Sequence, residues 1–310
     1  MRTWITLWMM LGAGAFVAGC PADDDDATPS DDDAGDDDDD AGDEWVITQV
    51  GDDNVGTQNH LVVAGDDVWI GTWSNEAYAD GICDEIEVDP PPKMRQELWL
   101  YERPVAGGNW TSQLIDAPVV PVSPQGFDLK EDPQGRPAVA YLGGEPQMQF
   151  CGGNDAVFSV RDGGTWTPET AGAESGDSAT GLPASDAGFV VGIWPSLAFD
   201  ADGNPAVTYK DTHFGSMQHD DQYRADLEFA LGAAGWTHEA PDPGEGAGDY
   251  GSLVFDNEGR AVALYAITVE AQGNSRHGVW AARRELTGEW TLVKLHVGAV
   301  HLEVEAIVAP

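Results

Sequence analysis

The chain has 310 residues, enough for one or two ordinary domains with sizeable cores. Its 55 Asp and Glu residues outweigh 14 Lys and Arg residues, so the formal net charge is −41 at pH 7. Such a surface repels phosphate backbones and anionic head groups, which argues against a nucleic-acid partner. Cations or neutral ligands suit it better, unless the acidity only keeps a secreted protein soluble.

The first residues read as an export signal. A short positive start, Met1-Arg2, precedes an apolar run from Trp4 to Val17 that is too short to span a bilayer. The sequence Val17-Ala18-Gly19-Cys20 then resembles the lipobox of bacterial lipoproteins. The resemblance implies that residues 1–19 are removed and that Cys20 is acylated. We therefore expect a lipid-anchored protein of the bacterial cell envelope, at the outer membrane or cell surface; an ordinary secretory leader is the alternative.

Residues 20–44 are predicted to form a disordered tether. They hold 13 Asp residues and one Glu among Ala, Thr, Pro, Ser and Gly, so they cannot build a core and they repel one another. A calcium-binding tail is the alternative, although calcium needs a fixed cage of oxygen ligands.

A pattern of four short strands recurs from residue 45 onward. Apolar residues alternate with polar ones between Asp-Gly or Gly-rich turns, most clearly from Trp194 to Asp242. A tryptophan opens the last strand of each copy, at Trp110, Trp166, Trp236 and Trp290. Four-stranded sheets repeated in series predict an all-β protein, a β-propeller of four to five blades over residues 45–310. A β-sandwich is the alternative.

The two ends of this domain are expected to meet in the closing blade of the ring. Trp45–Val50 resembles an outermost strand in its pattern, and His301–Val308 would be the innermost strand of the same blade. Only two strands are then available for that blade. The ring is therefore either four-bladed with a clasp or five-bladed with one incomplete blade.

The repeats resemble those of secreted bacterial propellers with a Ser-Leu-Ala-x-Asp-x-x-Gly-x-Pro-x-Val-x-Tyr pattern, as in Ser196–Tyr209. They are more distantly similar to the Asp-box repeats of sialidase-like propellers, which Ser159–Trp166 approaches. Sialidase chemistry, as the resemblance has it, uses an arginine cluster and a Tyr nucleophile. The chain has few Arg residues and no Arg-Ile-Pro segment, which argues against that activity.

The long loops between second and third strands of each copy are predicted to share one face of the ring. Binding groups gather on such loops. Cys83 and Cys151 lie in the first two of them, and export to an oxidising compartment predicts a disulfide between them. Free thiols or a metal pair are the alternatives.

An aromatic residue ends each second strand near that face. Such rings are candidates for stacking on sugar faces, and packing between blades is the competing interpretation. The four residues are Trp73, Tyr141, Tyr209 and Tyr265.

Two segments have some metal-ligand character. The loop from Asp211 to Asp221 holds two His and three Asp residues, but no motif with tight ligand spacing. The segment Asp200–Asn204 resembles part of a calcium loop, yet Asp-Gly in a hairpin turn explains it without a metal. We expect neither a metal nor a cofactor.

No nucleophile elbow and no cysteine beside a base is present. The sequence therefore favours a non-catalytic propeller that binds a glycan or a partner protein. A carbohydrate-active hydrolase of sialidase-like propeller type, using paired carboxylates, is the second hypothesis. A passive envelope or assembly protein is the third.

Overall fold

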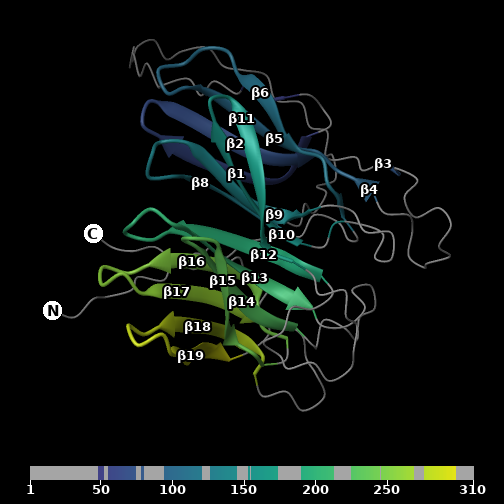
Figure 1. Ribbon diagram of the computed structural model, residues 1–310. Helices are drawn as coiled ribbons and strands as arrows, with labels where there is room; N and C mark the ends of the chain where they lie inside the picture. The colour runs from purple at the N-terminus through teal and green to yellow at the C-terminus, as the bar shows by residue number, and fades with distance from the viewer. Residues whose placement is uncertain are drawn as a thin grey trace, which may run out of the picture.

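The computed structural model describes residues 48–51, 55–74, 78–79, 94–120, 126–144, 153, 155–173, 190–212, 225–244, 246–268 and 276–297. Within these ranges the regular structure is β throughout, in four antiparallel four-stranded sheets and one small three-stranded sheet. The prediction of an all-β propeller of four-stranded blades is confirmed, and Figure 1 shows the sheets in series. In the described part of the chain, no helix has the length and apolar character needed to cross a membrane.

Each of the four large sheets, called blades 1 to 4, is a meander of strands that follow one another in the sheet. Blade 1 consists of β1 (Val55–Ala64), β2 (Asp67–Ser74), β5 (Leu98–Pro104) and β6 (Thr111–Asp116). Blade 2 consists of β8 (Phe127–Glu131), β9 (Pro137–Gly143), β10 (Asp155–Asp162) and β11 (Thr165–Gly172).

Blades 3 and 4 repeat this arrangement. Blade 3 consists of β12 (Val190–Phe199), β13 (Pro205–Thr212), β14 (Ala225–Gly232) and β15 (Trp236–Asp242). Blade 4 consists of β16 (Asp249–Phe255), β17 (Ala261–Ile267), β18 (Gly278–Arg284) and β19 (Trp290–Val297). The small sheet, which the sequence pattern did not predict, pairs β3 (Tyr78–Ala79), β4 (Met94–Arg95) and β7 (Val119–Val120).

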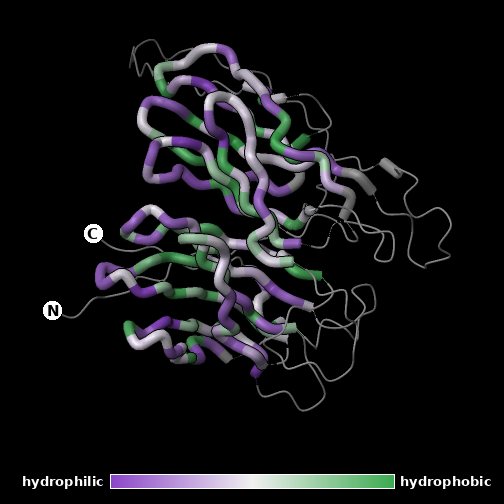
Figure 2. Tube along the Cα trace, viewed as in Figure 1, coloured by the Kyte–Doolittle hydropathy of each residue, from purple (hydrophilic) through white to green (hydrophobic). Residues whose placement is uncertain are grey.

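Neighbouring blades pack face to face. The strand β8 lies against β1, and β12 lies against both β8 and β16. Hydrophobic residues follow the strands, and hydrophilic residues gather at the hairpin tips on the left of the molecule (Figure 2). The core therefore consists of layers between blades, because each sheet covers one face of its neighbour.

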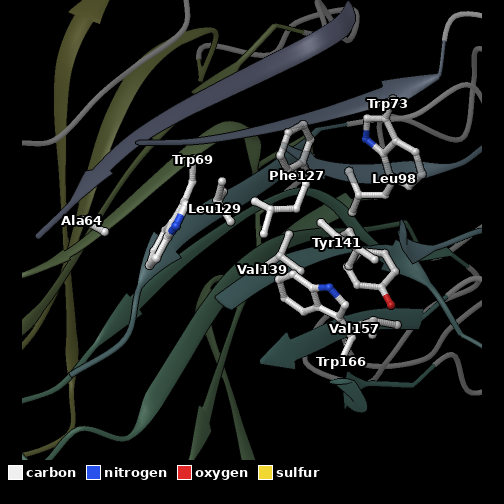
Figure 3. Close-up of a cluster of buried hydrophobic side chains, with 12 residues drawn as sticks. Ala64, Trp69, Trp73, Leu98, Phe127, Leu129, Val139, Tyr141, Val157 and Trp166 are labelled. Carbon is white, nitrogen blue, oxygen red and sulfur yellow. The ribbon is translucent and has the colours of Figure 1, made fainter. Parts of the chain in front are cut away.

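The repeated tryptophans form part of these layers. Trp236 packs edge-on against Phe158 of blade 2, with ring centroids 5.8 Å apart. Trp290 packs in the same way against Phe229 of blade 3, at 5.3 Å. Between blades 1 and 2, Trp166 joins a buried cluster with Trp69 and other side chains (Figure 3). Each of these three tryptophans thus packs on the blade before its own.

An Asp–Gly turn joins the first two strands in blades 2, 3 and 4. In blade 4, the Asp256 Oδ1 atom accepts hydrogen bonds from the backbone N–H groups of Glu258 and Arg260, each at 2.9 Å. The Arg260 side chain donates to Oδ2 at 2.8 Å. Burial alone would raise the pKa of Asp256, but these donors lower it below 3.8. Asp132 and Asp200 accept the equivalent bonds, so the Asp200 carboxylate is engaged by its own turn.

Exchange of Asp256 for alanine is expected to lower the free energy of unfolding by about 1–2 kcal/mol, because three donors lose one acceptor. The control is Asn257→Ala, an exposed position of the same turn, for which we expect a change within about 0.5 kcal/mol. Urea unfolding of the two variants measures the difference. Equal stability of the two would show that the turn geometry does not depend on the carboxylate.

Candidate functional site

The first strands of all four blades surround one cavity of about 460 Å³. They are therefore the innermost strands of the ring, and we call this space the axial cavity. Its volume falls in the range of small-ligand pockets. The lining residues that carry the argument are Gln58, His60, Asp128, Lys130, Trp194 and Tyr250.

The same pattern of residues recurs at the innermost strand of each blade. A residue with positive φ comes first, a cavity-lining residue follows two positions later, and a leucine comes directly after it. The residues with positive φ are Gln58 (53°), Gly126 (86°), Trp194 (51°) and Tyr250 (53°). The cavity-lining residues two places on are His60, Asp128, Ser196 and Ser252.

Positive φ is unusual for bulky side chains and costs about 1–3 kcal/mol at each such residue. Trp194 and Tyr250 both adopt it, and their rings lie 4.4 Å apart with planes tilted by 35°. Gly126 makes room for this pair, since a Cβ atom there would lie 3.0 Å from the Trp194 ring. Residues with a strained backbone concentrate at active sites and ligand sites. The surrounding structure must hold them in place there, because their conformation by itself is unfavourable.

Asp128 is the polar centre of the cavity. Its side chain is 6% exposed, and its Oδ1 atom lies 3.5 Å from His60 Nδ1 and 3.3 Å from Lys130 Nζ. Its Oδ2 atom accepts hydrogen bonds from the Ser196 hydroxyl at 3.0 Å and from the Leu197 backbone N–H at 2.8 Å. Burial alone would raise the pKa of Asp128, but His60, Lys130 and the Leu197 N–H together lower it below 3.8. Asp128 is therefore ionised at neutral pH.

These polar contacts continue from blade to blade. The Ser196 hydroxyl, which donates to Asp128, accepts a hydrogen bond from the Leu253 backbone N–H at 2.9 Å. On the other side, the Gln58 side chain accepts a bond from the Gly126 N–H at 2.9 Å. The innermost strands are thus held in register by the side chains that line the cavity, which keeps the site preorganised.

The four aromatic residues that the sequence proposed as a binding rim lie elsewhere. Trp73, Tyr141, Tyr209 and Tyr265 are 0–2% exposed, and none of them lines the axial cavity. The Tyr141 hydroxyl donates to Asp116 of blade 1 at 2.7 Å, and the Tyr265 hydroxyl donates to Asp242 of blade 3. Burial, with Asp116 as a second cause, raises the pKa of Tyr141. The structure thus places these rings in the packing between blades, the alternative that the sequence left open.

Other sequence-based predictions lie outside the described residues. They include the acylated Cys20, the tether over residues 20–44, the disulfide between Cys83 and Cys151, the closing strand His301–Val308 and the two histidines of the loop after Asp211. Among the residues that the structure describes, no group of three or more His, Cys, Asp or Glu side chains is arranged to hold a metal ion.

Sequence reasoning missed the axial residues, although a signal for them was present. His60, Asp128, Ser196 and Ser252 each directly precede a leucine in the first strand of their copy. An alignment of the four copies would have shown that the residue before the leucine occupies the same position in each copy but differs in type between copies. That pattern is typical of a site built on a repeated scaffold.

No protein-family model and no curated protein matches the chain. Among solved structures, it is similar to a xylan β-1,4-xylosidase from Bacillus halodurans C-125 with a TM-score of 0.42 and 14% identity, over 83% of this chain and 48% of that one. An α-L-arabinanase from Penicillium chrysogenum gives 0.42 and 14%, over 78% and 67% of the two chains. An α-L-arabinofuranosidase from Lactobacillus brevis gives 0.43 and 13%, over 75% and 74%. This chain thus spans about half the length of the xylosidase.

Proposed function

We propose that the axial cavity binds a neutral carbohydrate. The observation that carries this proposal is the pair of strained aromatic rings, Trp194 and Tyr250, at a wall of the cavity. Aromatic faces stack on the C–H faces of sugars, and a few fixed polar groups then orient the hydroxyl groups. Gln58, His60 and Asp128 supply amide, imidazole and carboxylate groups in the same cavity.

The charges of the site favour an uncharged ligand. Asp128 is balanced within the cavity by the ammonium group of Lys130, while the protein as a whole carries a formal charge of −41. An anionic ligand would be repelled on approach, whereas a neutral polyol would not.

The described lining supplies groups that could bind a carbohydrate. Hydrolysis of a glycosidic bond commonly uses two carboxyl groups about 5–10 Å apart. Asp128 is the one carboxylate among the described residues that line the cavity, and it is engaged by four neighbouring groups. A hydrolase would need a second carboxylate from another part of the chain.

The test is titration calorimetry of the full chain with a panel of neutral pentose and hexose oligosaccharides. Exchange of Trp194 for alanine is expected to raise Kd at least about tenfold, because one stacking face is lost. Trp194→Gly should lose the same affinity while keeping the free energy of unfolding within about 1 kcal/mol, since glycine tolerates positive φ.

The control for this test is Trp99→Ala, a half-buried tryptophan of β5 outside the cavity lining, which should leave Kd unchanged. Equal binding by the wild type and Trp194→Ala would contradict the proposal. Release of reducing ends in the same samples would identify the protein as a hydrolase instead.

The cellular setting remains a proposal from the sequence. The lipobox-like segment ending at Cys20 and the acidic residues 20–44 support a propeller held at a membrane by a lipid anchor and a charged tether. The axial cavity would then meet glycans outside the cytoplasm.

A further inference from the structure

One leucine occupies the same position in the innermost strand of every blade, but its exposure differs sharply. Leu129 of blade 2 is 1% exposed, Leu197 of blade 3 is 0% exposed and Leu253 of blade 4 is 2% exposed. The equivalent Leu61 of blade 1 is 65% exposed. Among the residues that the structure describes, blade 1 therefore lacks the element that covers this leucine in the other three blades.

The covering element is the preceding blade in each of the three buried cases. Leu129 belongs to a cluster with Trp69 and Trp73 of blade 1 (Figure 3). Leu197 clusters with Ala140 and Phe158 of blade 2. Leu253 clusters with residues of blade 3, such as Leu227 and Phe229. The innermost strand of the preceding blade borders the same position, since Asp128 accepts a hydrogen bond from the Leu197 N–H and Ser196 accepts one from the Leu253 N–H. By the same rule, Leu61 should face a blade that precedes blade 1 around the ring.

The face of blade 1 that carries Leu61, called its open face, exposes apolar side chains of the kind that other blades bury. Val63, two residues after Leu61 in β1, is 61% exposed. A hollow of about 330 Å³ beside Leu61 is lined by Val55, Ile70, Tyr101 and Val50, among others. Val50 belongs to the segment 48–51 that leads into the domain, so this segment already lies against the open face.

We propose that the segment His301–Val308 of this same chain covers Leu61 as the innermost strand of a fifth blade. The segment carries Leu302, Val304, Ala306 and Val308 at alternate positions, the pattern of a strand with one apolar face. It follows β19, the outermost strand of blade 4, and the chain passes from an outermost strand to the next innermost strand at each earlier junction.

The position of the strand is tested without any ligand, on the full chain. Leu61→Ala is expected to lower Tm by roughly 5 °C or more, as for a buried leucine, whereas Leu286→Ala, 77% exposed in a turn, should change Tm by no more than about 1 °C. Hydrogen exchange should show peptide amides of residues 302–308 exchanging at least about 100-fold more slowly than in an unstructured chain. In a chain that ends at residue 298, Leu61→Ala should have no further effect on Tm.

Equal Tm values for Leu61→Ala and Leu286→Ala would overturn the proposal, as would unprotected amides over residues 302–308. A Leu61→Ala effect that depends on protein concentration would assign the face to a second copy of the chain and would also overturn it.

If the wild type binds no oligosaccharide but Leu61 behaves as a buried residue, the proposed function fails and the fifth strand stands.

Discussion

Replacement of Asp249 by alanine is expected to lower the free energy of unfolding by about 3–5 kcal/mol, because it leaves a buried ammonium group without its partner. Lys210 is 2% exposed, and its Nζ atom lies 2.5 Å from Asp249 Oδ1. The other oxygen of Asp249 accepts hydrogen bonds from the backbone N–H and the hydroxyl of Thr268. The pair joins β13 of blade 3 to the first residue of β16 in blade 4.

The double variant Lys210→Met with Asp249→Leu is the matched control. Removing both charges avoids an isolated buried ion, so this variant should recover most of the stability that Asp249→Ala loses. Urea unfolding of the wild type, the single variant and the double variant measures the coupling between the two side chains. A loss below about 1 kcal/mol for Asp249→Ala would mean that water or another group solvates Lys210.

The blades were predictable because their signals are local. Alternation of apolar residues and Asp-Gly punctuation marked the strands around Asp132, Asp200 and Asp256, and the carboxylates there close their turns through backbone N–H groups within four residues. Copies of one local pattern also implied sheets that must cover one another, since a single meander cannot bury both of its faces.

The axial site was not predictable in the same way. Trp194 and Tyr250 reach the cavity because their backbone adopts positive φ, a conformation that no propensity of tryptophan or tyrosine indicates. The aromatic residues at the ends of the second strands were more prominent in the sequence, but they serve the layers between blades. Tyr141 and Tyr265 each bind an aspartate of the preceding blade there.

The repeat itself separates packing residues from site residues in the innermost strands. Leucine is kept in all four copies, and its place faces the preceding blade in three of them. The residue just before it changes from His60 to Asp128 to Ser196, and this place faces the axis. A scaffold position is uniform because each interface needs the same volume, whereas a position that faces the axis is not under that constraint and can vary.

Exchange of Asp128 for asparagine is therefore expected to affect stability and binding together. Two hydrogen bonds to a buried charge are weakened, those from the Ser196 hydroxyl and the Leu197 N–H, and such bonds contribute about 1.5–3 kcal/mol each. We expect a loss of about 2–4 kcal/mol in the free energy of unfolding at pH 7. Oligosaccharide affinity should fall at least about tenfold, because His60 and Lys130 lose the group that positions them.

The pH dependence of stability shows whether Asp128 acts through its negative charge or only through its hydrogen bonds. The pKa of Asp128 is lower in the folded protein than in the unfolded chain, so its contribution to stability is present above about pH 3.8 and is lost as the pH falls through the folded-state pKa. The stability difference between the wild type and Asp128→Asn should therefore shrink progressively below pH 4. Asp202→Asn, at an exposed turn position, should parallel the wild type throughout. If the difference in free energy of unfolding between the two proteins stays constant down to pH 2, Asp128 acts through shape or hydrogen bonding alone. A contribution from the ionised carboxylate would be lost when the group is protonated.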